Sequence, residues 1–397
     1  MKSDRSITIR QARVWDGNEV GFSLRDLHIV DGIVADAPDP GAESFDGRGF
    51  WVLPGLIDNH FHAYATSMDG FENERGPLSF AAVNGAARLG KALRRGFTTV
   101  RDVAGGDIGL LRARDTGVIT APRYFFTGPA LSQTGGHGDP RSEHVDVCFS
   151  HGHMCEIVDG VDALRVAVRE RLRTGAHAIK VMTSGGVFSL TDPLSVPQYA
   201  PEELQTVTAE AARRKSYVAA HAYSPEAIMH AIENGVRTIE HGNLLDRKTA
   251  REMARRSAYL VPTLAAYDAM SRRGAGLGLN EVSLAKNEEV LTRGQEAIRI
   301  ALDAGVQVGF GSDLMGDLED DQLRGVQLQV EASGAEATLH AMTVVNAEIL
   351  GDRALGHLRP GAYGDAVVLS QDPMSTPSAL WSPEAREAVL LAGRRVE

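Results

Sequence analysis

Short apolar segments alternate with amphipathic segments from about residue 55 onward. Several apolar segments are nearly continuous, which is typical of parallel strands covered by helices on both faces. The pattern predicts eight strands, over residues 55–62, 98–103, 124–128, 178–182, 217–221, 238–241, 259–263 and 307–312. Eight strand–helix units in about 300 residues is the number found in a (β/α)8 barrel, so the predicted fold class is α/β.

Helical periodicity fills the spaces between the predicted strands. Apolar residues recur on one helix face over residues 161–174, at Val161, Leu164, Val168 and Leu172. Another helix is predicted to begin at Pro201, because proline is favoured in the first turn and the next two residues are acidic. These helices are expected to cover the outside of the barrel.

The two ends of the chain show the alternating pattern of β-strands instead. Strand alternation with turn residues covers residues 7–10 and 27–34, and it returns at residues 364–369 and 389–391. Neither end is long enough to bury a core alone. We therefore expect residues 1–54 and 357–397 to form one small, β-sandwich-like domain, with the barrel of residues 55–356 inserted between them.

Composition and charge exclude several classes of protein. The net charge of −11 disfavours nucleic acid or an anionic membrane as partner. No run of about 20 apolar residues predicts a transmembrane helix, and no apolar segment near residue 1 predicts a signal peptide. Two cysteines make no disulfide framework. We expect a cytoplasmic enzyme with a small-molecule substrate, and arginine-rich helices fit a homo-oligomer.

Six residues of metal-ligand type follow the predicted strands: His60, His62, Lys180, His221, His241 and Asp313. In a (β/α)8 barrel the carboxyl ends of the strands form the catalytic face. His60 and His62 are two positions apart, so on a strand both side chains point to the same side. A single histidine at a strand end is more often a hydrogen-bonding residue, but the joint pattern predicts a metal site.

Lys180 has two interpretations. A protonated ammonium has no lone pair to offer a cation, so the residue is either a salt-bridging lysine or a chemically modified one. Reaction with CO₂ would give a carbamate with two anionic oxygens, able to bridge two metals. Burial at this position would favour the reaction by lowering the pKa of the amine.

Five stretches carry a family resemblance: His60-x-His62, 134–139 (TGGHGD), 179–186 (IKVMTSGG), 219–223 (AAHAY) and 239–242 (IEHG). Together with Asp313 they resemble the amidohydrolase superfamily in its binuclear form. They are most similar to the imidazolonepropionase-like branch that includes prolidase-type dipeptidases and amidases of N-acyl amino acids. The resemblance implies two divalent metal ions, expected to be zinc, and a carbamate on Lys180.

The resemblance also implies a reaction. Such an enzyme cleaves the amide C–N bond of a dipeptide (Xaa-Pro or similar) or of an N-acyl amino acid by attack of a metal-bridging hydroxide. Asp313 would accept the hydroxide proton and deliver it to the leaving nitrogen. His137 and Tyr223 are expected to contact the substrate and assist catalysis by donating a hydrogen bond to the oxyanion or to a carboxylate.

Other interpretations stay open. Carbamates, lactones or esters could be hydrolysed at the same site. A mononuclear deaminase, an imidazolone hydrolase or a non-catalytic scaffold is disfavoured by Lys180 and by the complete ligand set. The segment around Cys148 and Cys155 also contains His144, His151 and His153. That composition suits zinc, but its spacing matches no zinc module, and a lid over the pocket is the stronger interpretation.

Overall fold

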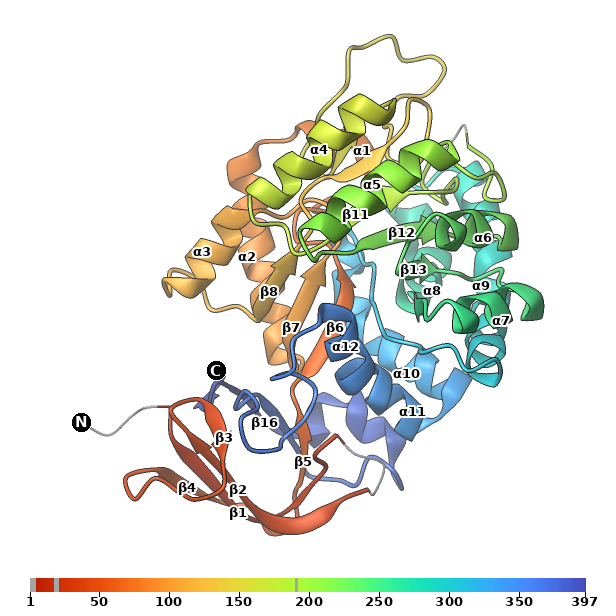
Figure 1. The fold of residues 1–397 in the computed structure, drawn as a ribbon. Coiled ribbons are helices and arrows are strands. Elements are labelled where there is room, and N and C mark those ends of the chain that lie inside the picture. The colour runs from red at the N-terminus through yellow and green to blue at the C-terminus, as the bar shows by residue number, and fades with distance from the viewer. Residues whose placement is uncertain (1–4, 18–20, 190–191) are drawn as a thin grey trace.

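Parallel strands and helices alternate through most of the chain in the computed structural model, which describes residues 5–17, 21–189 and 192–397 (Figure 1). One sheet contains six strands in the order β10-β9-β11-β12-β13-β14, and another contains three in the order β6-β7-β8. These strands are β6 (Leu56–Phe61), β7 (Phe97–Asp102), β8 (Arg123–Phe126), β9 (Ala130–Ser132), β10 (Cys155–Ile157), β11 (Ile179–Met182), β12 (Val218–Ala222), β13 (Thr238–His241) and β14 (Tyr259–Val261). Every pair in both sheets is parallel, as predicted.

The predicted strand over residues 124–128 is only part of a longer interrupted segment. β8 pairs with β7, whereas β9 pairs with β10 and β11. Gly128 between them has a φ of 71°, outside the strand region, and Pro129 has no N–H to give to a ladder. The interruption explains why one extended segment contributes to two sheets.

The predicted strand over residues 307–312 is wrong as a regular strand, although its backbone lies between β14 and β6. Gly309 N donates to Leu260 O at 2.8 Å, and Asn59 N donates to Phe310 O at 3.0 Å. The side chain of Asn346 also bonds to this segment, accepting from Phe310 N at 3.1 Å and donating to Phe310 O at 2.9 Å. The side-chain amide of Asn346 therefore makes backbone hydrogen bonds that a neighbouring strand would make in a regular sheet.

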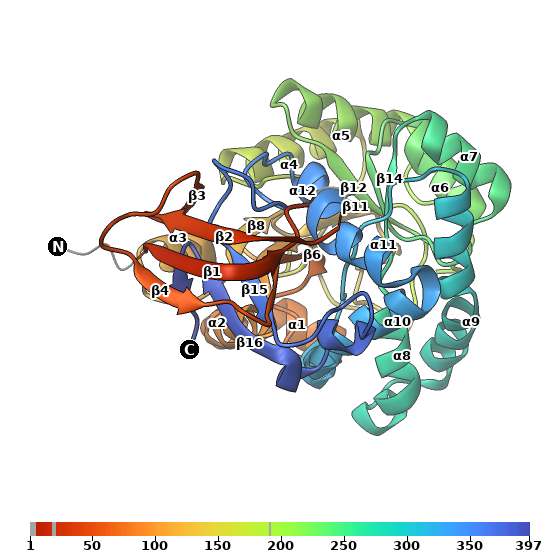
Figure 2. The ribbon, with the colours of Figure 1, turned by 90° about the horizontal axis from the view of Figure 1, so that it is seen from below.

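The helices lie outside the parallel strands (Figure 2). They are α1 (Gly70–Arg75), α2 (Leu78–Arg94), α3 (Ile108–Asp115), α4 (Val161–Arg173), α5 (Pro201–Arg213), α6 (Pro225–Glu233), α7 (Arg247–Arg255), α8 (Leu264–Arg273), α9 (Glu281–Asp303), α10 (Gln322–Ser333), α11 (Ala335–His340) and α12 (Asn346–Leu350). The two predicted helices are confirmed by α4 and α5. None of the helices in the described ranges is long and apolar enough to cross a membrane.

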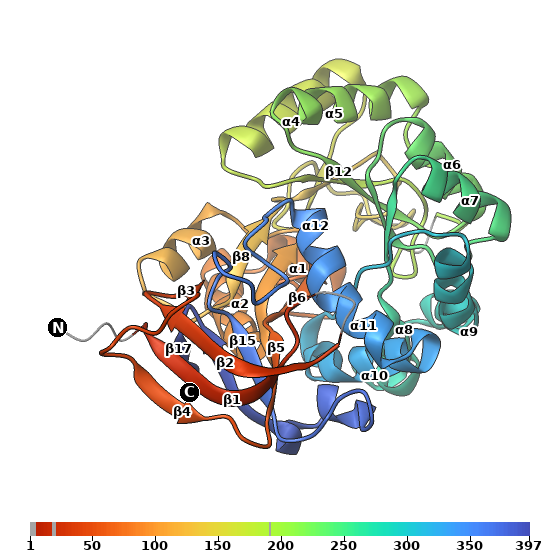
Figure 3. The same cartoon turned by 60° about the horizontal axis from the view of Figure 1, so that its bottom comes forward.

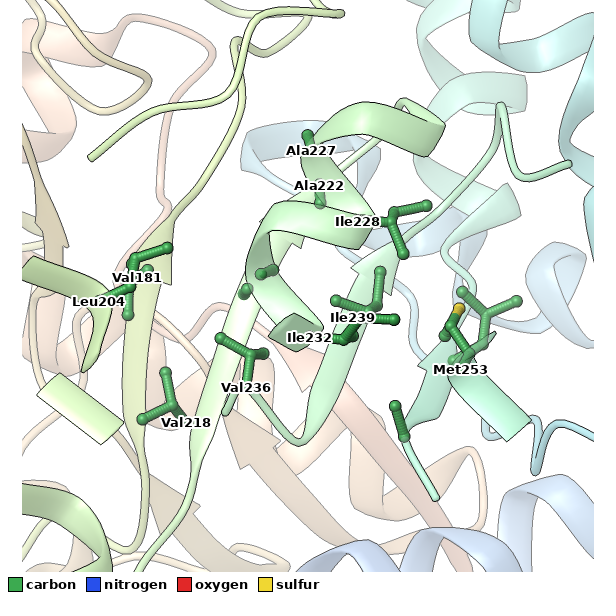
Figure 4. Packing of buried hydrophobic residues seen from close by; sticks show 14 of the residues in the cluster. Val181, Leu204, Val218, Ala222, Ala227, Ile228, Ile232, Val236, Ile239 and Met253 are labelled. Atoms are coloured by element: carbon green, nitrogen blue, oxygen red, sulfur yellow. The ribbon is translucent and has the colours of Figure 1, made fainter. Parts of the chain in front are cut away.

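The largest apolar cluster packs strands against these helices (Figure 4). Val181 and Ile239 on the strands are fully buried against Leu204 of α5 and Ile228 of α6. Burial of each such side chain contributes roughly 1.5–3 kcal/mol. This packing holds the carboxyl ends of β11, β12 and β13 in fixed positions.

Strands from both ends of the chain share one eight-stranded sheet (Figure 3). Its members are β1 (Ile7–Val14), β2 (Ser23–Val30), β3 (Ile33–Ala35), β4 (Glu43–Asp46), β5 (Trp51–Pro54), β15 (Ala366–Leu369), β16 (Arg386–Leu391) and β17 (Arg394–Arg395). β5 joins the two groups, because it pairs with β1 on one side and with β15 on the other. A separate apolar cluster, which includes Ile9, Leu27 and Val368, lies against this sheet.

Candidate metal centre and active site

All the predicted site residues line one cavity of about 410 Å³. They are His60, His62, His137, Lys180, His221, Tyr223, His241 and Asp313. Most belong to the carboxyl ends of β6, β12 and β13 or directly follow them, whereas Lys180 is the second residue of β11 and Asp313 follows the irregular segment 307–312. The structure therefore brings together side chains that lie far apart in the sequence.

His60, His62 and Asp313 form a compact group of donors. Their ligand atoms all lie within 4.8 Å of one another. Oδ1 of Asp313 is 2.9 Å from Nε2 of His62 and 3.4 Å from Nε2 of His60. Two imidazole nitrogens and a carboxylate oxygen that converge in this way are a suitable donor set for a divalent cation such as zinc.

The other two histidines lie beside this group. The ring centroid of His241 is 4.9 Å from that of His60 and 4.5 Å from that of His221. Nδ1 of His241 lies 3.6 Å from Oδ2 of Asp313. The four imidazoles thus form a continuous row along the cavity floor, with Asp313 in contact with three of them.

Lys180 is 2% exposed and lines the same cavity. Burial is the main cause that lowers the pKa of its amine to about 8. A lower pKa increases the fraction of neutral amine near pH 7, which is the form that reacts with CO₂. None of the hydrogen bonds among the described residues involves its Nζ, so the salt-bridging interpretation gains no support.

The backbone at two of the predicted ligands departs from the conformations of ordinary strands. φ is 73° at His241 and 54° at Asp313, in the left-handed region that non-glycine residues seldom adopt. Adjacent strand residues normally point to opposite faces. The turn at His241 allows its imidazole to face the cavity although Glu240, the residue before it, also points inward toward His60. Such local strain is often found at functional sites.

The surroundings of Asp313 favour its carboxylate form. Burial alone would raise its pKa, but the neighbouring His60 and His62 lower the pKa well below its usual value. An ionised carboxylate is suited to bind a cation.

Each of three histidines has a partner on a ring nitrogen. Nδ1 of His60 is 2.8 Å from Oε2 of Glu240, and Nδ1 of His62 is 3.4 Å from the carbonyl oxygen of Ala104. The partners of His241 Nδ1 are two buried hydroxyls, those of Thr263 and Tyr267, at 2.8 and 2.9 Å. Partners of this kind orient metal-binding imidazoles. For His60 and His62 they leave Nε2 facing Asp313.

His137 and Tyr223 lie on the cavity wall next to His221. The His137 ring stacks on that of His221 at 4.1 Å, and its Nδ1 is 2.9 Å from Ser189 Oγ. The close approach requires Gly186, because a Cβ there would lie 2.2 Å from the His137 ring. Tyr223 makes an edge contact with His221 at 4.8 Å, and its hydroxyl is 2.9 Å from that of Tyr267. Both side chains are therefore held in place.

The segment with several cysteines and histidines forms no second metal group. His144 and Cys148 are exposed, and Nε2 of His153 donates to the carbonyl oxygen of Gly76 at 2.8 Å. His60, His62 and Asp313 make the one such group found in the described part of the chain. Cys155 and Met154 line the main cavity instead, so this segment borders the pocket. Its role as a lid stays a prediction.

Several residues around the site were not predicted from the sequence. Glu240 lies inside a motif that resembles the family, but its contact with His60 depends on how β13 and β6 lie within the fold. Arg101, Thr263 and Tyr267 belong to segments with no recognisable motif. The sequence gives no indication that these three residues contact the site. Arg101 and Thr263 are simply polar residues within or just after a buried strand, and Tyr267 lies on a helix.

Comparison with known proteins agrees with this site. The chain belongs to the amidohydrolase family, whose model matches residues 51–396. A solved structure of a prolidase complexed with N-methylphosphonate-L-proline is 38% identical, covers 99% of each chain and has a TM-score of 0.95. Ochratoxinase of Aspergillus niger is 31% identical over 366 residues, which are 86% of this chain and 75% of that protein. A solved Xaa-Pro dipeptidase is 26% identical, covers 99% and 100% of the two chains and has a TM-score of 0.87.

Proposed function

We propose that the protein is a metal-dependent hydrolase that cleaves the amide C–N bond of a dipeptide, Xaa-Pro or similar, or of an N-acyl amino acid. One observation carries the proposal. Four imidazoles, Asp313 and the buried amine of Lys180 line a single cavity. The imidazoles lie at or next to the carboxyl ends of parallel strands. A pocket that only binds a small molecule does not require so many potential metal ligands in one place.

The fold that supports this site is a (β/α)8 barrel in our proposal. The segment 307–313 hydrogen bonds with β14 on one side and β6 on the other, and His177 N donates to Phe126 O at 2.8 Å where the two sheets meet near β8. These contacts support a closed barrel of residues 55–356. We assign residues 1–54 and 357–397 to a composite β-domain, because both ends contribute strands to one sheet.

The residues present fit two divalent cations, with zinc as the expected metal. His60, His62 and Asp313 would hold one ion, and His221 and His241 the other. A carbamate on Lys180 would lie between them as a shared anionic ligand. When bound, the two ions supply an activated water and polarise the scissile carbonyl.

The protein's own groups would then move the proton and orient the substrate. Asp313 is ionised and lies at the centre of the ligand set, so it would accept a proton from the attacking water and return it to the leaving nitrogen. Protonation is required because an amide nitrogen is a poor leaving group. His137 and Tyr223 would donate hydrogen bonds to the oxyanion or to the substrate carboxylate.

One part of the cavity wall supports an apolar side chain in the substrate, although charged residues such as Glu74, Asp139 and Arg141 line other parts. The apolar residues along its wall include Met68, Val187, Phe188, Met270, Leu279 and Leu318. A wall of this kind favours proline or another apolar residue over a charged one. The likeness to a prolidase and to an Xaa-Pro dipeptidase supports the same substrate class.

The test is hydrolysis of a panel of dipeptides and N-acyl amino acids by zinc-loaded protein, with and without a chelator. Release of free amino acid that the chelator abolishes and zinc restores is the expected result. A protein that carries two metals but cleaves no member of the panel would remove the peptidase and amidase assignment and favour carbamate, lactone or ester substrates. Location in the cytoplasm and assembly into a homo-oligomer stay predictions from the sequence.

A further inference from the structure

A fully buried arginine–carboxylate pair lies directly behind the first predicted ligand, His60. Arg101 on β7 and Glu240 on β13 are both 0% exposed. Nη2 of Arg101 donates to Oε1 and Oε2 of Glu240 at 2.8 and 2.9 Å. Oε2 of the same carboxylate lies 2.8 Å from Nδ1 of His60. Three strands are thereby linked by one chain of charged hydrogen bonds.

The contact orients the imidazole ring of His60. An ionised carboxylate only accepts hydrogen bonds, so the nitrogen that points to Glu240 is a donor, Nδ1–H. With Nδ1 held by Glu240, Nε2 lies on the opposite side of the ring and faces Asp313 at 3.4 Å. Without an acceptor behind it, the ring would lose the contact that fixes this orientation.

Arg101 acts on His60 by a second route as well. Its Nε donates to the carbonyl oxygen of Asn59 at 2.7 Å, which fixes the backbone immediately before His60. The remaining acceptor capacity of Glu240 Oε1 is used by the Thr238 hydroxyl at 2.7 Å. The carboxylate is thus held by partners on both oxygens and has little freedom to turn away from His60.

We propose that Glu240 and Arg101 are positioning residues for His60, which hold its ring so that Nε2 is directed at the cavity. An ion pair that only stabilises the fold would not require a histidine as a further hydrogen-bond partner of the carboxylate. A comparable pair exists elsewhere in the chain: Arg123 donates to both oxygens of buried Asp365 at 2.6 and 3.1 Å, and no histidine of the described residues hydrogen bonds to that carboxylate. This inference rests on the proposed metal centre.

The experiment compares Glu240→Gln with Asp365→Asn as its control. A glutamine at position 240 keeps the shape of the side chain but offers only one accepting oxygen to both Arg101 and His60. Two properties are measured: the zinc affinity of each variant, by competition with a chromophoric chelator, and the tautomer of His60 in metal-free protein labelled with ¹⁵N-histidine. A double variant, Arg101→Met with Glu240→Met, removes both charges, so no unpaired buried charge remains if the single variant unfolds.

Glu240→Gln and the double variant should bind zinc 10–100-fold more weakly at one of the two sites and lose the fixed Nδ1–H signal of His60. Asp365→Asn should change neither property. Wild-type zinc affinity and an unchanged His60 tautomer in both variants would overturn the inference and leave the metal centre intact. A wild-type protein that binds no zinc would overturn the metal centre as well.

Discussion

Nε2 of His62 lies 2.9 Å from Oδ1 of Asp313, although 251 positions separate the two residues in the chain. Asp313 N also donates to the carbonyl oxygen of His60 at 2.8 Å, so backbone and side chain together fix the carboxylate against the two histidines. Close packing is possible because residue 311 is glycine: a Cβ there would lie 2.3 Å from the Cβ of His60. Asp313 is therefore held against both histidines by its side chain and its backbone.

Asp313→Asn should reduce kcat by at least about 100-fold while the protein keeps at least one metal, because the amide can still ligate but cannot accept a proton. Turnover of an N-acyl amino acid and metal content per chain are measured together. Asp317→Asn, at an exposed position of the short 3-10 helix that follows (Gly316–Asp321), is the matched control and should retain normal turnover. Near wild-type kcat in Asp313→Asn would exclude the residue as the proton shuttle.

The sequence was sufficient to predict that the expected ligands line one cavity, because they lie in or next to apolar extended segments that meet there. Their roles as metal ligands stay predictions. His60 and His62 could be paired from their spacing alone. The contact between Glu240 and Arg101 could not be predicted, since it depends on the relative positions of strands β13 and β7, which do not pair with each other.

Two errors in the predicted strands have the same origin. The segment 307–312 fails as a strand because Asn346, from a later helix, bonds to its backbone. The segment 124–128 is interrupted because the chain turns at Gly128 and passes from one sheet to the other. Apolar patterning identifies a buried extended segment, but it carries no information on which groups satisfy its backbone.

Asn346→Ala should destabilise the protein by about 2–4 kcal/mol, because buried backbone groups lose their partners. Its side chain accepts from Phe310 N and donates to Phe310 O and to Ile57 O, at 3.1, 2.9 and 2.7 Å. Urea unfolding followed by fluorescence measures the change. Asn287→Ala is the control: that buried side chain makes one such bond, to Tyr267 O, and its loss should cost about 1 kcal/mol. Equal effects of the two substitutions would contradict a special role for Asn346.

Glu74 should make stability fall as pH rises. Its Oε2 accepts from the backbone N–H groups of Met154 and Cys155, and burial raises the pKa of the carboxyl from 4.5 to about 7. The folded protein therefore holds this proton more tightly than the unfolded chain between these two pH values. Stability from this group is complete below pH 4.5 and is lost as pH rises through about 7.

The corresponding variant is Glu74→Gln, which cannot ionise. Relative to wild type, its free energy of unfolding should improve by about 2–3 kcal/mol between pH 5 and pH 8. Urea unfolding at the two pH values measures the difference. Glu72→Gln, exposed on the same helix, should show no such pH dependence. A constant difference between Glu74→Gln and wild type across this range would mean that Glu74 is ionised in the folded protein throughout.

Lys180→Ala tests the carbamate directly. The substitution should lower kcat by at least about 100-fold and reduce the metal content, because the anion shared by the two ions is lost. Acetate or propionate should restore part of the activity in a saturable manner, since a small carboxylate can enter the space left by the side chain. The activity of His62→Ala should not be restored by either anion, because that variant lacks an imidazole and not a carbamate.

Wild-type protein loaded with metal in ¹³C-bicarbonate should also give a carbamate carbon signal that Lys180→Ala lacks. If Lys180→Ala kept full activity and two metal ions per chain, Lys180 would not be a metal ligand.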